Sequence, residues 1–242
     1  MRIPRIFTPQ VLNENSSIVL DDAAANHVAK VLRMKVGRQL FVFNGENEHH
    51  FEAVVESCER RSVTLKLHNK VITQLESPLH IHLGQAISKG DRFEFAIQKA
   101  VELGVNEVTP LWTEHCDVKL NSERLEKKLR QWRQIAIAAC EQSGRDIVPT
   151  IHDPQDLSLW LTNTQAQEKW VLDPRGLAQQ ETSQDIRRAC ILVGPEGGLS
   201  NQEVEQAGSE HFKAKLIGPR ILRTETAALT ALCLMQNLWG DF

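Results

Sequence analysis

The chain has 242 residues, of which 41% are hydrophobic and 24% charged, a composition typical of globular domains with a buried core rather than of disordered or fibrous chains. No apolar run approaches the roughly 20 residues of a membrane span, and residues 1–10 lack the apolar stretch of a signal peptide, so we expect a cytoplasmic protein without a membrane partner. The net charge of -3 excludes a generally basic nucleic-acid binder.

The charge is distributed unevenly along the chain. Residues 211–223 carry four Lys/Arg and no Asp/Glu, and residues 119–145 carry seven against three, whereas residues 155–210 carry four against nine. Basic patches on an acidic frame favour RNA binding at particular positions, although each patch by itself is also typical of the solvated face of an ordinary helix.

The cysteines and histidines show no spacing that is typical of metal sites. The five cysteines are spread from Cys58 to Cys233 without a C-x-x-C pair, and the nine histidines form no H-E-x-x-H. This argues against a disulfide framework and against a zinc site. We therefore expect no metal.

The first seventy or so residues are rich in strand-forming patterns, with one helical insertion. Apolar residues at helical spacing predict a helix over residues 23–33. Three β-rich runs follow within residues 39–67, separated by hairpin signals at residues 44–47 and 59–61. The pattern predicts a small β-barrel domain over residues 1–72.

A polar stretch that ends at Pro78 separates this barrel from a second predicted domain, residues 73–242, in which strands and helices alternate. The predicted elements are a strand over residues 79–87, a helix over 91–104, a strand over 106–112, a long helix over 122–144, three short strands that begin at Lys169, Cys190 and Lys213, and a terminal helix over 227–239. Strands followed by helices predict an α/β domain with a parallel sheet and crossover connections. The terminal helix is apolar nearly all round, which predicts burial on several sides.

Three strand ends in the second domain, VLDP, VGPEGG and IGPRILR, carry residues suited to a ligand-binding turn. In open parallel sheets, ligands bind where the strands end. Gly194, Gly197 and Gly198 lack side chains, so a ligand can lie against the backbone, and Ser200 with Glu203 forms a helix-capping box. Neither G-x-G-x-x-G nor G-K-S/T is present, which argues against a standard phosphate site. Tight turns alone also account for the glycines.

Two segments near the C-terminus, GPEGGLSNQE from Gly194 and LIGPRILRTETAAL from Leu216, resemble the paired signature of the bacterial 16S rRNA (uracil-N3) methyltransferases of the RsmE type, in the knotted SPOUT class. HVAKVLRMKVGRQLFVFNG, IQKAVELGV and AACEQSGRDIVP agree with the same family, so the resemblance spans nearly the whole chain. It implies a PUA-like RNA-binding barrel, an α/β domain with a trefoil knot, a homodimer, and S-adenosylmethionine as methyl donor. Spacing alone does not predict a knot, because threaded chains are rare exceptions.

The resemblance also implies that the loops after the three strands hold the cofactor. The residues to which this transfers are Leu172, Val193, Gly194, Glu196, Gly197, Gly198, Ile217, Gly218, Pro219, Ile221 and Leu222. An adenine ring needs backbone partners at its edge and apolar walls, for which Ile217, Ile221 and Leu222 are candidates. Core packing is the alternative role of these side chains.

Methylation of uracil N3 requires that the base be unpaired or flipped out and that N3 lose its proton. A fixed cation beside the pocket would stabilise the resulting anion, and Arg223 is the first candidate. Glu196 or Glu225 would accept the proton. The ordinary alternatives are a Glu225 carboxylate placed at a helix N-terminus and an ion pair between it and Arg223. His27 is more typical of a solvent-facing helix residue.

RNA contacts are expected from Arg2, Arg5, Arg33 and Arg38 of the barrel and from Arg133 on the long helix, with 16S rRNA in the small ribosomal subunit as the partner. Two alternatives remain. One is a related knotted methyltransferase that acts on another RNA or another base atom. The other is a non-catalytic RNA-binding or ribosome-assembly factor with the same fold.

Overall fold

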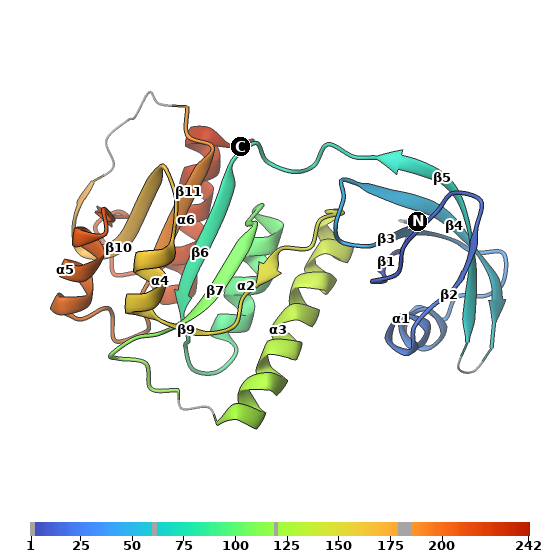
Figure 1. Ribbon diagram of the computed structural model, residues 1–242, viewed down its shortest axis with the longest axis horizontal. Helices are drawn as coiled ribbons and strands as arrows, with labels where there is room; N and C mark the ends of the chain where they lie inside the picture. Colours follow the sequence, from blue (N-terminus) through green and yellow to red (C-terminus); the bar gives the residue numbers. More distant parts are fainter. Residues whose placement is uncertain (1–2, 60–61, 119–120, 179–184) are drawn as a thin grey trace. The chain divides into compact units, whose positions relative to one another are not determined.

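The chain folds into two compact units (Figure 1), and the computed structural model describes residues 3–59, 62–118, 121–178 and 185–242. Unit 1 consists of Met1–Glu76 and Cys140–Val148, and unit 2 consists of Ser77–Ala139 and Pro149–Phe242. The return of Cys140–Val148 to the first unit is a feature that no pattern in the sequence predicted.

Unit 1 is built around a β-sheet in which the strands lie in the order β1-β3-β4-β5-β2. Its elements are β1 (Arg5–Phe7), β2 (Ser17–Val19), α1 (Asp22–Asn26), the π-helix η1 (His27–Val31), β3 (Gln39–Phe43), β4 (His49–Cys58) and β5 (Val63–Ile72). The Asp21 side chain accepts hydrogen bonds from the backbone N–H groups of Ala23 and Ala24, which explains why the helix starts there. Inward-facing residues such as Val55 form the core of the unit.

Unit 2 contains a parallel sheet with strand order β12-β10-β11-β6-β7-β8, and β9 also pairs with β7. Its elements are β6 (His80–Ala86), α2 (Arg92–Glu102), β7 (Glu107–Trp112), α3 (Ser122–Ser143, which ends in unit 1), β8 (Thr150–Ile151), β9 (Gln155–Asp156), α4 (Leu157–Asn163), β10 (Glu168–Ala178), β11 (Arg188–Val193), α5 (Asn201–Ser209), β12 (Lys213–Leu216) and α6 (Thr224–Trp239). The predicted parallel α/β sheet is confirmed.

Helices cover both faces of this sheet. Consecutive residues of a strand point to opposite faces of the sheet, so two consecutive residues of β6 identify what covers each face. Gly84 lies against Trp160 of α4, whereas Gln85 is hydrogen bonded to Thr224 of α6. The first face is therefore covered by α4, which packs on α5, and the second by α6, which packs on α2 (Figure 1).

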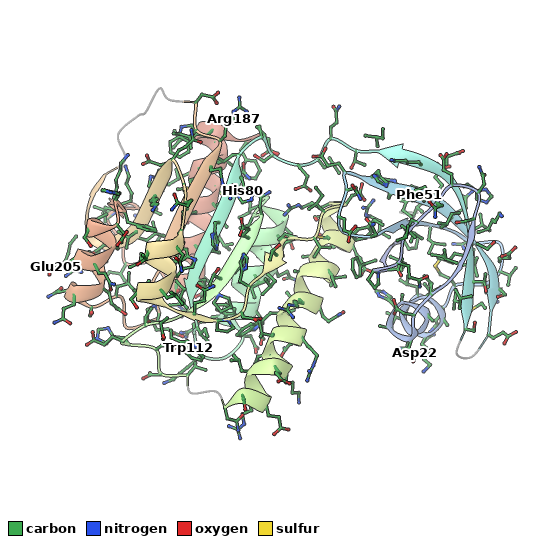
Figure 2. All side chains as sticks on the ribbon, in the orientation of Figure 1. Asp22, Phe51, His80, Trp112, Arg187 and Glu205 are labelled. Carbon is green, nitrogen blue, oxygen red and sulfur yellow. The ribbon has the colours of Figure 1, made fainter. Side chains whose placement is uncertain are left out.

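The amino and carboxyl ends of the parallel strands form two opposite edges of the sheet. His80 begins β6 at one edge, and Trp112 ends β7 at the other (Figure 2). The loops after β10, β11 and β12 belong to the carboxyl edge. The three glycine- and proline-containing turns predicted to bind a ligand thus leave the sheet at the same edge.

The observed helices agree with the predicted apolar patterns in most respects. On α3, Leu129, Trp132 and Ala136 are buried and share one face of the helix. The terminal helix α6 begins at Thr224, three residues before the predicted start, and it buries residues such as Leu232. The strands β8 and β9 were not predicted, because strands of two residues have no periodicity to recognise. In the described part of the chain, no helix is both long and apolar enough to cross a membrane.

Candidate functional site

Loops at the carboxyl edge of the unit 2 sheet enclose a cavity of about 590 Å³. They follow β10, β11 and β12, and the segment that leads into α6 completes the wall. The predicted cofactor residues that line this cavity are Leu172, Val193, Gly194, Glu196, Gly197, Gly198, Ile217, Ile221 and Leu222. The structure therefore brings together residues that lie far apart in the sequence.

Gly218 and Pro219 are the predicted cofactor residues that do not line the cavity. Both are exposed, and Gly218 has a φ of 69°, in the left-handed region that favours glycine. These two residues form the turn that redirects the chain from β12 towards Ile221 and Leu222. Their expected contact with the cofactor stays a prediction.

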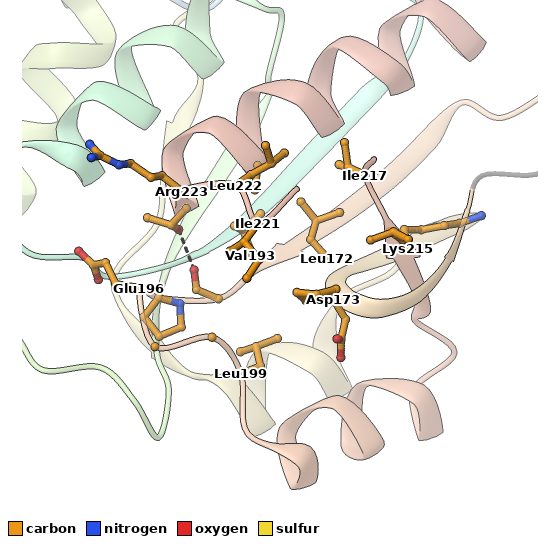
Figure 3. A pocket seen from close by; sticks show the side chains of 18 of the residues that line it. Leu172, Asp173, Val193, Glu196, Leu199, Lys215, Ile217, Ile221, Leu222 and Arg223 are labelled. Atoms are coloured by element: carbon orange, nitrogen blue, oxygen red, sulfur yellow. Dashed lines mark hydrogen bonds between the residues drawn. The ribbon is translucent and has the colours of Figure 1, made fainter. Parts of the chain in front are cut away.

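The cavity has an apolar centre and charged side chains at two sides. Figure 3 shows Leu172 and Val193 near the centre, Asp173 on one side, and Glu196 with Arg223 on the other. Such a surface fits a nucleoside that carries charged groups away from its flat ring, because the ring packs on apolar walls and the charges reach polar ends.

The loop after β11 leaves backbone exposed to the cavity because it is rich in glycine. A Cβ atom at Gly194 would lie 3.0 Å from both Cγ and N of Leu199, so the chain there is packed as closely as glycine allows. Gly198 has a φ of 72° and donates its N–H to the Pro195 carbonyl at 2.9 Å. This loop fits a cofactor whose ring edge requires backbone partners.

The predicted capping box holds the far end of this loop. The Glu203 N–H donates to Ser200 Oγ at 3.3 Å, and the Ser200 N–H donates to Glu203 Oε2 at 2.8 Å. The N-cap residue of helix α5 is therefore fixed directly after Leu199, which lines the cavity. The prediction made from the S-x-x-E spacing is confirmed.

Glu196 ties the loop after β11 to the start of α2. Its Oε1 accepts a hydrogen bond from Arg92 Nη1 at 2.8 Å and another from the Lys89 N–H at 3.1 Å. Its Oε2 makes no hydrogen bond to any residue within the described ranges. The carboxylate is thus oriented through one oxygen, while the other is free to accept a proton.

Arg223 is exposed at the N-cap position of α6 and lines the cavity. Across the residues described, no hydrogen bond or ion pair engages its guanidinium, so the ion pair with Glu225 considered above is absent from that part of the molecule. Glu225 lies outside the cavity lining, and its Oε2 is buried without a hydrogen-bond partner among described groups. Arg223 thus lines the cavity and Glu225 does not, and the catalytic role expected of each stays a prediction.

Asp173 is a cavity residue that the sequence analysis did not single out, although it stands in the VLDP strand end. Hydrogen bonds from the Arg175 side chain, the closest at 2.7 Å, lower the pKa of Asp173 against the opposing effect of burial. Asp173 precedes a bulge, because the pairing of β10 with β12 shifts register between Leu172 and Leu177. The bulge places an ionised carboxylate at the cavity.

The basic residues predicted to contact RNA differ in their surroundings. Arg33 and Arg38 are exposed in unit 1. Arg133 is half exposed and forms an ion pair with Asp153 at 3.2 Å. Arg2 lies outside the described residues.

Arg5 requires a correction, because its side chain is only 7% exposed and forms an ion pair with Asp146. The same carboxylate accepts hydrogen bonds from Thr73 Oγ1 at 2.7 Å and from His50 Nδ1 at 3.1 Å. Although burial raises the pKa of Asp146, these hydrogen bonds outweigh that effect, so its pKa is lowered. Arg5 thus joins Cys140–Val148 to the sheet of unit 1 and is not available as an RNA contact.

His82, Glu107 and His152 form a cluster of metal-ligating types near the amino edge of the sheet, which the dispersed sequence positions did not reveal. His152 Nε2 hydrogen bonds to Glu107 Oε2 at 2.7 Å, and His82 Nε2 accepts from Trp160 Nε1 at 3.3 Å. Burial lowers the pKa of His82 to about 4, so its ring is neutral. Each member has a hydrogen-bond partner, and we assign the cluster a structural role.

Comparison with known proteins gives consistent matches over the whole chain. Residues 75–236 match the RNA methyltransferase domain family, and residues 20–67 match the RNA methyltransferase PUA domain family. A ribosomal RNA small subunit methyltransferase E from Buchnera aphidicola subsp. Schizaphis graminum is 39% identical over 242 residues, which covers 99% of this chain and 98% of that protein. The protein of that name from Bacillus subtilis is 31% identical over 246 residues, covering 93% of this chain and 92% of its own length.

Solved structures agree with these relatives. A ribosomal RNA small subunit methyltransferase E from Neisseria gonorrhoeae, bound to S-adenosyl methionine, has a TM-score of 0.92 and 36% identity over 100% of both chains. A Legionella pneumophila structure in complex with the bound cofactor SAM has a TM-score of 0.96 and 39% identity, also over 100% of both chains.

Proposed function

Because this chain belongs to the ribosomal RNA small subunit methyltransferase E family, we propose that it transfers a methyl group from S-adenosylmethionine to N3 of one uridine in 16S rRNA. The family matches confirm the expected fold class, a PUA-like barrel followed by an α/β-knot methyltransferase domain with a parallel sheet. They also confirm S-adenosylmethionine as the cofactor. The observation that carries the proposal for this chain is the cavity that the predicted loops enclose.

The lining of the cavity fits this cofactor in polarity. The backbone of the loop after β11 offers partners to the adenine edge, and Leu172, Ile217 and Leu222 offer apolar walls. Ile221 also lines the cavity although its side chain is 89% exposed, which is unusual for isoleucine and is relieved when a ligand covers it. Ionised Asp173 provides an acceptor for a hydroxyl or ammonium group.

The chemistry requires control of charge more than covalent catalysis. When bound, S-adenosylmethionine supplies an electrophilic methyl group, and an N3–C bond forms as the C–S bond breaks. Arg223 stabilises the negative charge that uracil gains at O2 and O4 when N3 is deprotonated, because its guanidinium has no other partner among the described residues. Glu196 accepts the N3 proton at its free Oε2, directly or through water, while Arg92 holds its Oε1.

Unit 1 supports RNA binding through a basic and apolar loop. This loop consists of residues 32–38, in which Arg33, Lys35, Val36 and Arg38 are exposed. Val31, the last residue of η1, is exposed beside it. Cations contact phosphates, and exposed apolar side chains pack on unstacked bases. Because Arg5 is buried in an ion pair, this loop is the part of unit 1 that we propose to contact 16S rRNA in the small subunit.

The working form of the protein is a homodimer in the cytoplasm. Helix α6 is apolar nearly all round, and Leu229, Leu234 and Leu238 remain half-buried in the single chain. A second copy of the chain would cover them, in agreement with the resemblance stated for the sequence. Sedimentation analysis at micromolar concentration tests this, and a monomer at that concentration would contradict it.

The deciding experiment is nucleoside mass spectrometry of 16S rRNA after incubation of the protein and S-adenosylmethionine with small subunits from a strain lacking the gene. We expect 3-methyluridine at one position. A methyl group on another atom or another RNA supports the related-methyltransferase alternative. No methylation and no cofactor binding together support a non-catalytic RNA-binding factor.

Replacement of Arg223 by methionine tests its assigned role. We expect turnover to fall about 100-fold, as when one stabilising donor is removed from an anion site, while cofactor affinity changes little. Arg187→Met, at an exposed arginine paired with Asp185, is the matched control. Near-normal turnover of Arg223→Met with normal cofactor affinity removes Arg223 from the mechanism.

A further inference from the structure

A hydrogen-bonded chain joins strand β6 to two walls of the cofactor cavity. Gln85 Nε2 donates to Thr224 Oγ1 at 2.8 Å, and Thr224 Oγ1 donates to the Gly194 carbonyl at 2.7 Å (the dashed line in Figure 3). Gln85 is 1% exposed and Thr224 is 6% exposed, so water does not compete for these bonds. The chain connects a strand, the start of α6 and the loop after β11.

The donor and acceptor of each hydrogen bond from Gln85 to Gly194 can be assigned in only one way. Gln85 Nε2 also lies 3.2 Å from the Ala86 carbonyl, which accepts hydrogen bonds and cannot donate them, so the amide nitrogen faces Ala86 and Thr224. The Thr224 hydroxyl accepts from Gln85, and its single proton therefore goes to the Gly194 carbonyl. Each bond depends on the direction of the other, and a hydroxyl is the group that can serve both.

Both ends of the second bond belong to the cavity lining, whereas Gln85 does not. Gly194 begins the glycine loop, and its backbone is already packed against Leu199. Glu196 holds the middle of the same loop through Arg92. The bond from Thr224 is the corresponding attachment at the start of the loop, and it also sets the distance between that loop and the segment that carries Leu222.

We propose that Gln85 and Thr224 are positioning residues, which keep the Gly194 loop in the conformation that binds S-adenosylmethionine. The inference rests on the proposed function for its ligand and adds two residues to the site. A loop released from Thr224 populates other conformations, and the apparent affinity falls by the fraction of time that the loop is competent. Loss of the hydroxyl also leaves the Gly194 carbonyl without its buried donor, which disfavours the native arrangement.

The test is Thr224→Val, which keeps the shape of the side chain and removes the hydroxyl. Isothermal titration with S-adenosylmethionine is expected to show affinity about tenfold weaker than wild type, as for a loop that is competent roughly one-tenth of the time. Thr224→Ser retains the hydroxyl and is expected to restore most of the affinity. Gln85→Met keeps the hydrogen bond from Thr224 to the Gly194 carbonyl but removes the donor that orients the Thr224 hydroxyl. We therefore expect a smaller decrease in affinity, about threefold.

Thr109→Val is the matched control, because Thr109 is fully buried in β7 and its Oγ1 is hydrogen bonded to His82 Nε2 at 2.8 Å, away from the cavity lining. It is expected to lower the melting temperature without changing affinity. The inference is overturned if Thr224→Val binds as tightly as wild type, or if Thr109→Val weakens binding equally. If Thr224→Val does not fold, Gln85→Met is compared with Thr109→Val instead. The inference is then overturned if Gln85→Met binds S-adenosylmethionine no more weakly than Thr109→Val does. Failure of the wild-type protein to bind would instead refute the proposed function.

Discussion

Asp146 is the residue whose removal best tests how Cys140–Val148 is held in unit 1. Its carboxylate is 1% exposed and serves Arg5, His50 and Thr73 at once. The substitution Asp146→Ala leaves the Arg5 guanidinium buried without its counter-charge. Breaking a buried ion pair in this way costs about 3–5 kcal/mol, and an upper value near 5 is expected here because two further donors also lose their acceptor.

A matched surface pair and a double variant separate this cost from a general effect of mutation. Glu52→Ala removes an exposed carboxylate of β4 that accepts a hydrogen bond from Asn69 Nδ2 at 2.9 Å, and such a contact contributes about 1 kcal/mol or less. Arg5→Met combined with Asp146→Ala removes both charges, so it is expected to be less destabilised than Asp146→Ala alone.

The assay must report on unit 1. The five tryptophans, Trp112, Trp132, Trp160, Trp170 and Trp239, all lie in unit 2, and the chain has no tyrosine. Intrinsic fluorescence therefore does not follow unit 1, whereas hydrogen exchange of β4 and β5 during urea unfolding does. If Asp146→Ala destabilises these strands no more than Glu52→Ala does, the assigned role of the buried carboxylate is wrong.

Two predictions concern the sheet of unit 2. A Cβ atom at Gly84 would lie 2.8 Å from Trp160 Cζ3 and closer to two other ring carbons, so Gly84→Ala is expected to cost about 2 kcal/mol or more, measured by urea unfolding followed by tryptophan fluorescence. An unchanged midpoint would show that the ring moves freely. The folded pKa of His82, about 4, lies below its unfolded value near 6.5, so its stabilising contribution is complete above pH 6.5 and is lost as the pH falls. Between pH 7.5 and 5.5 this amounts to about 1–1.5 kcal/mol, and His82→Gln is expected to remove that part of the pH dependence; an identical pH dependence in the variant would exclude His82 as its source.

Local patterns explain which parts of the molecule the sequence predicted well. Apolar periodicity identified the longer strands and the long helices, because a residue's neighbours within a few positions decide which side of an element is buried. Glycine and proline marked the loops after β11 and β12 for the same reason, and the Ser200–Glu203 capping box depends on a spacing of three residues. The resemblance of the C-terminal motifs to a known family predicted the cofactor residues, and most of these residues line the cavity.

The errors came from residues whose roles depend on distant partners. Arg5 was expected to face RNA because arginine is usually exposed, yet it pairs with Asp146, which is 141 residues away in the chain. Gly218 carries the same kind of signal as Gly194, yet it has a φ of 69° and does not line the cavity. Residue type alone does not distinguish these cases.

By itself, the sequence predicted the longer strands and helices and the change from a β-rich domain to one with alternating strands and helices, since these follow from short-range spacing and turn chemistry. Its resemblance to a known family predicted which loops hold the cofactor. The tertiary structure alone decided which polar side chains are buried together. Gln85 in β6 meets Thr224 across 139 positions because the parallel register and the packing of α6 on the sheet bring them together. A glutamine in an apolar strand gives no local sign of such a partner, because the free energy of a buried hydrogen bond depends on the group that the fold places opposite it.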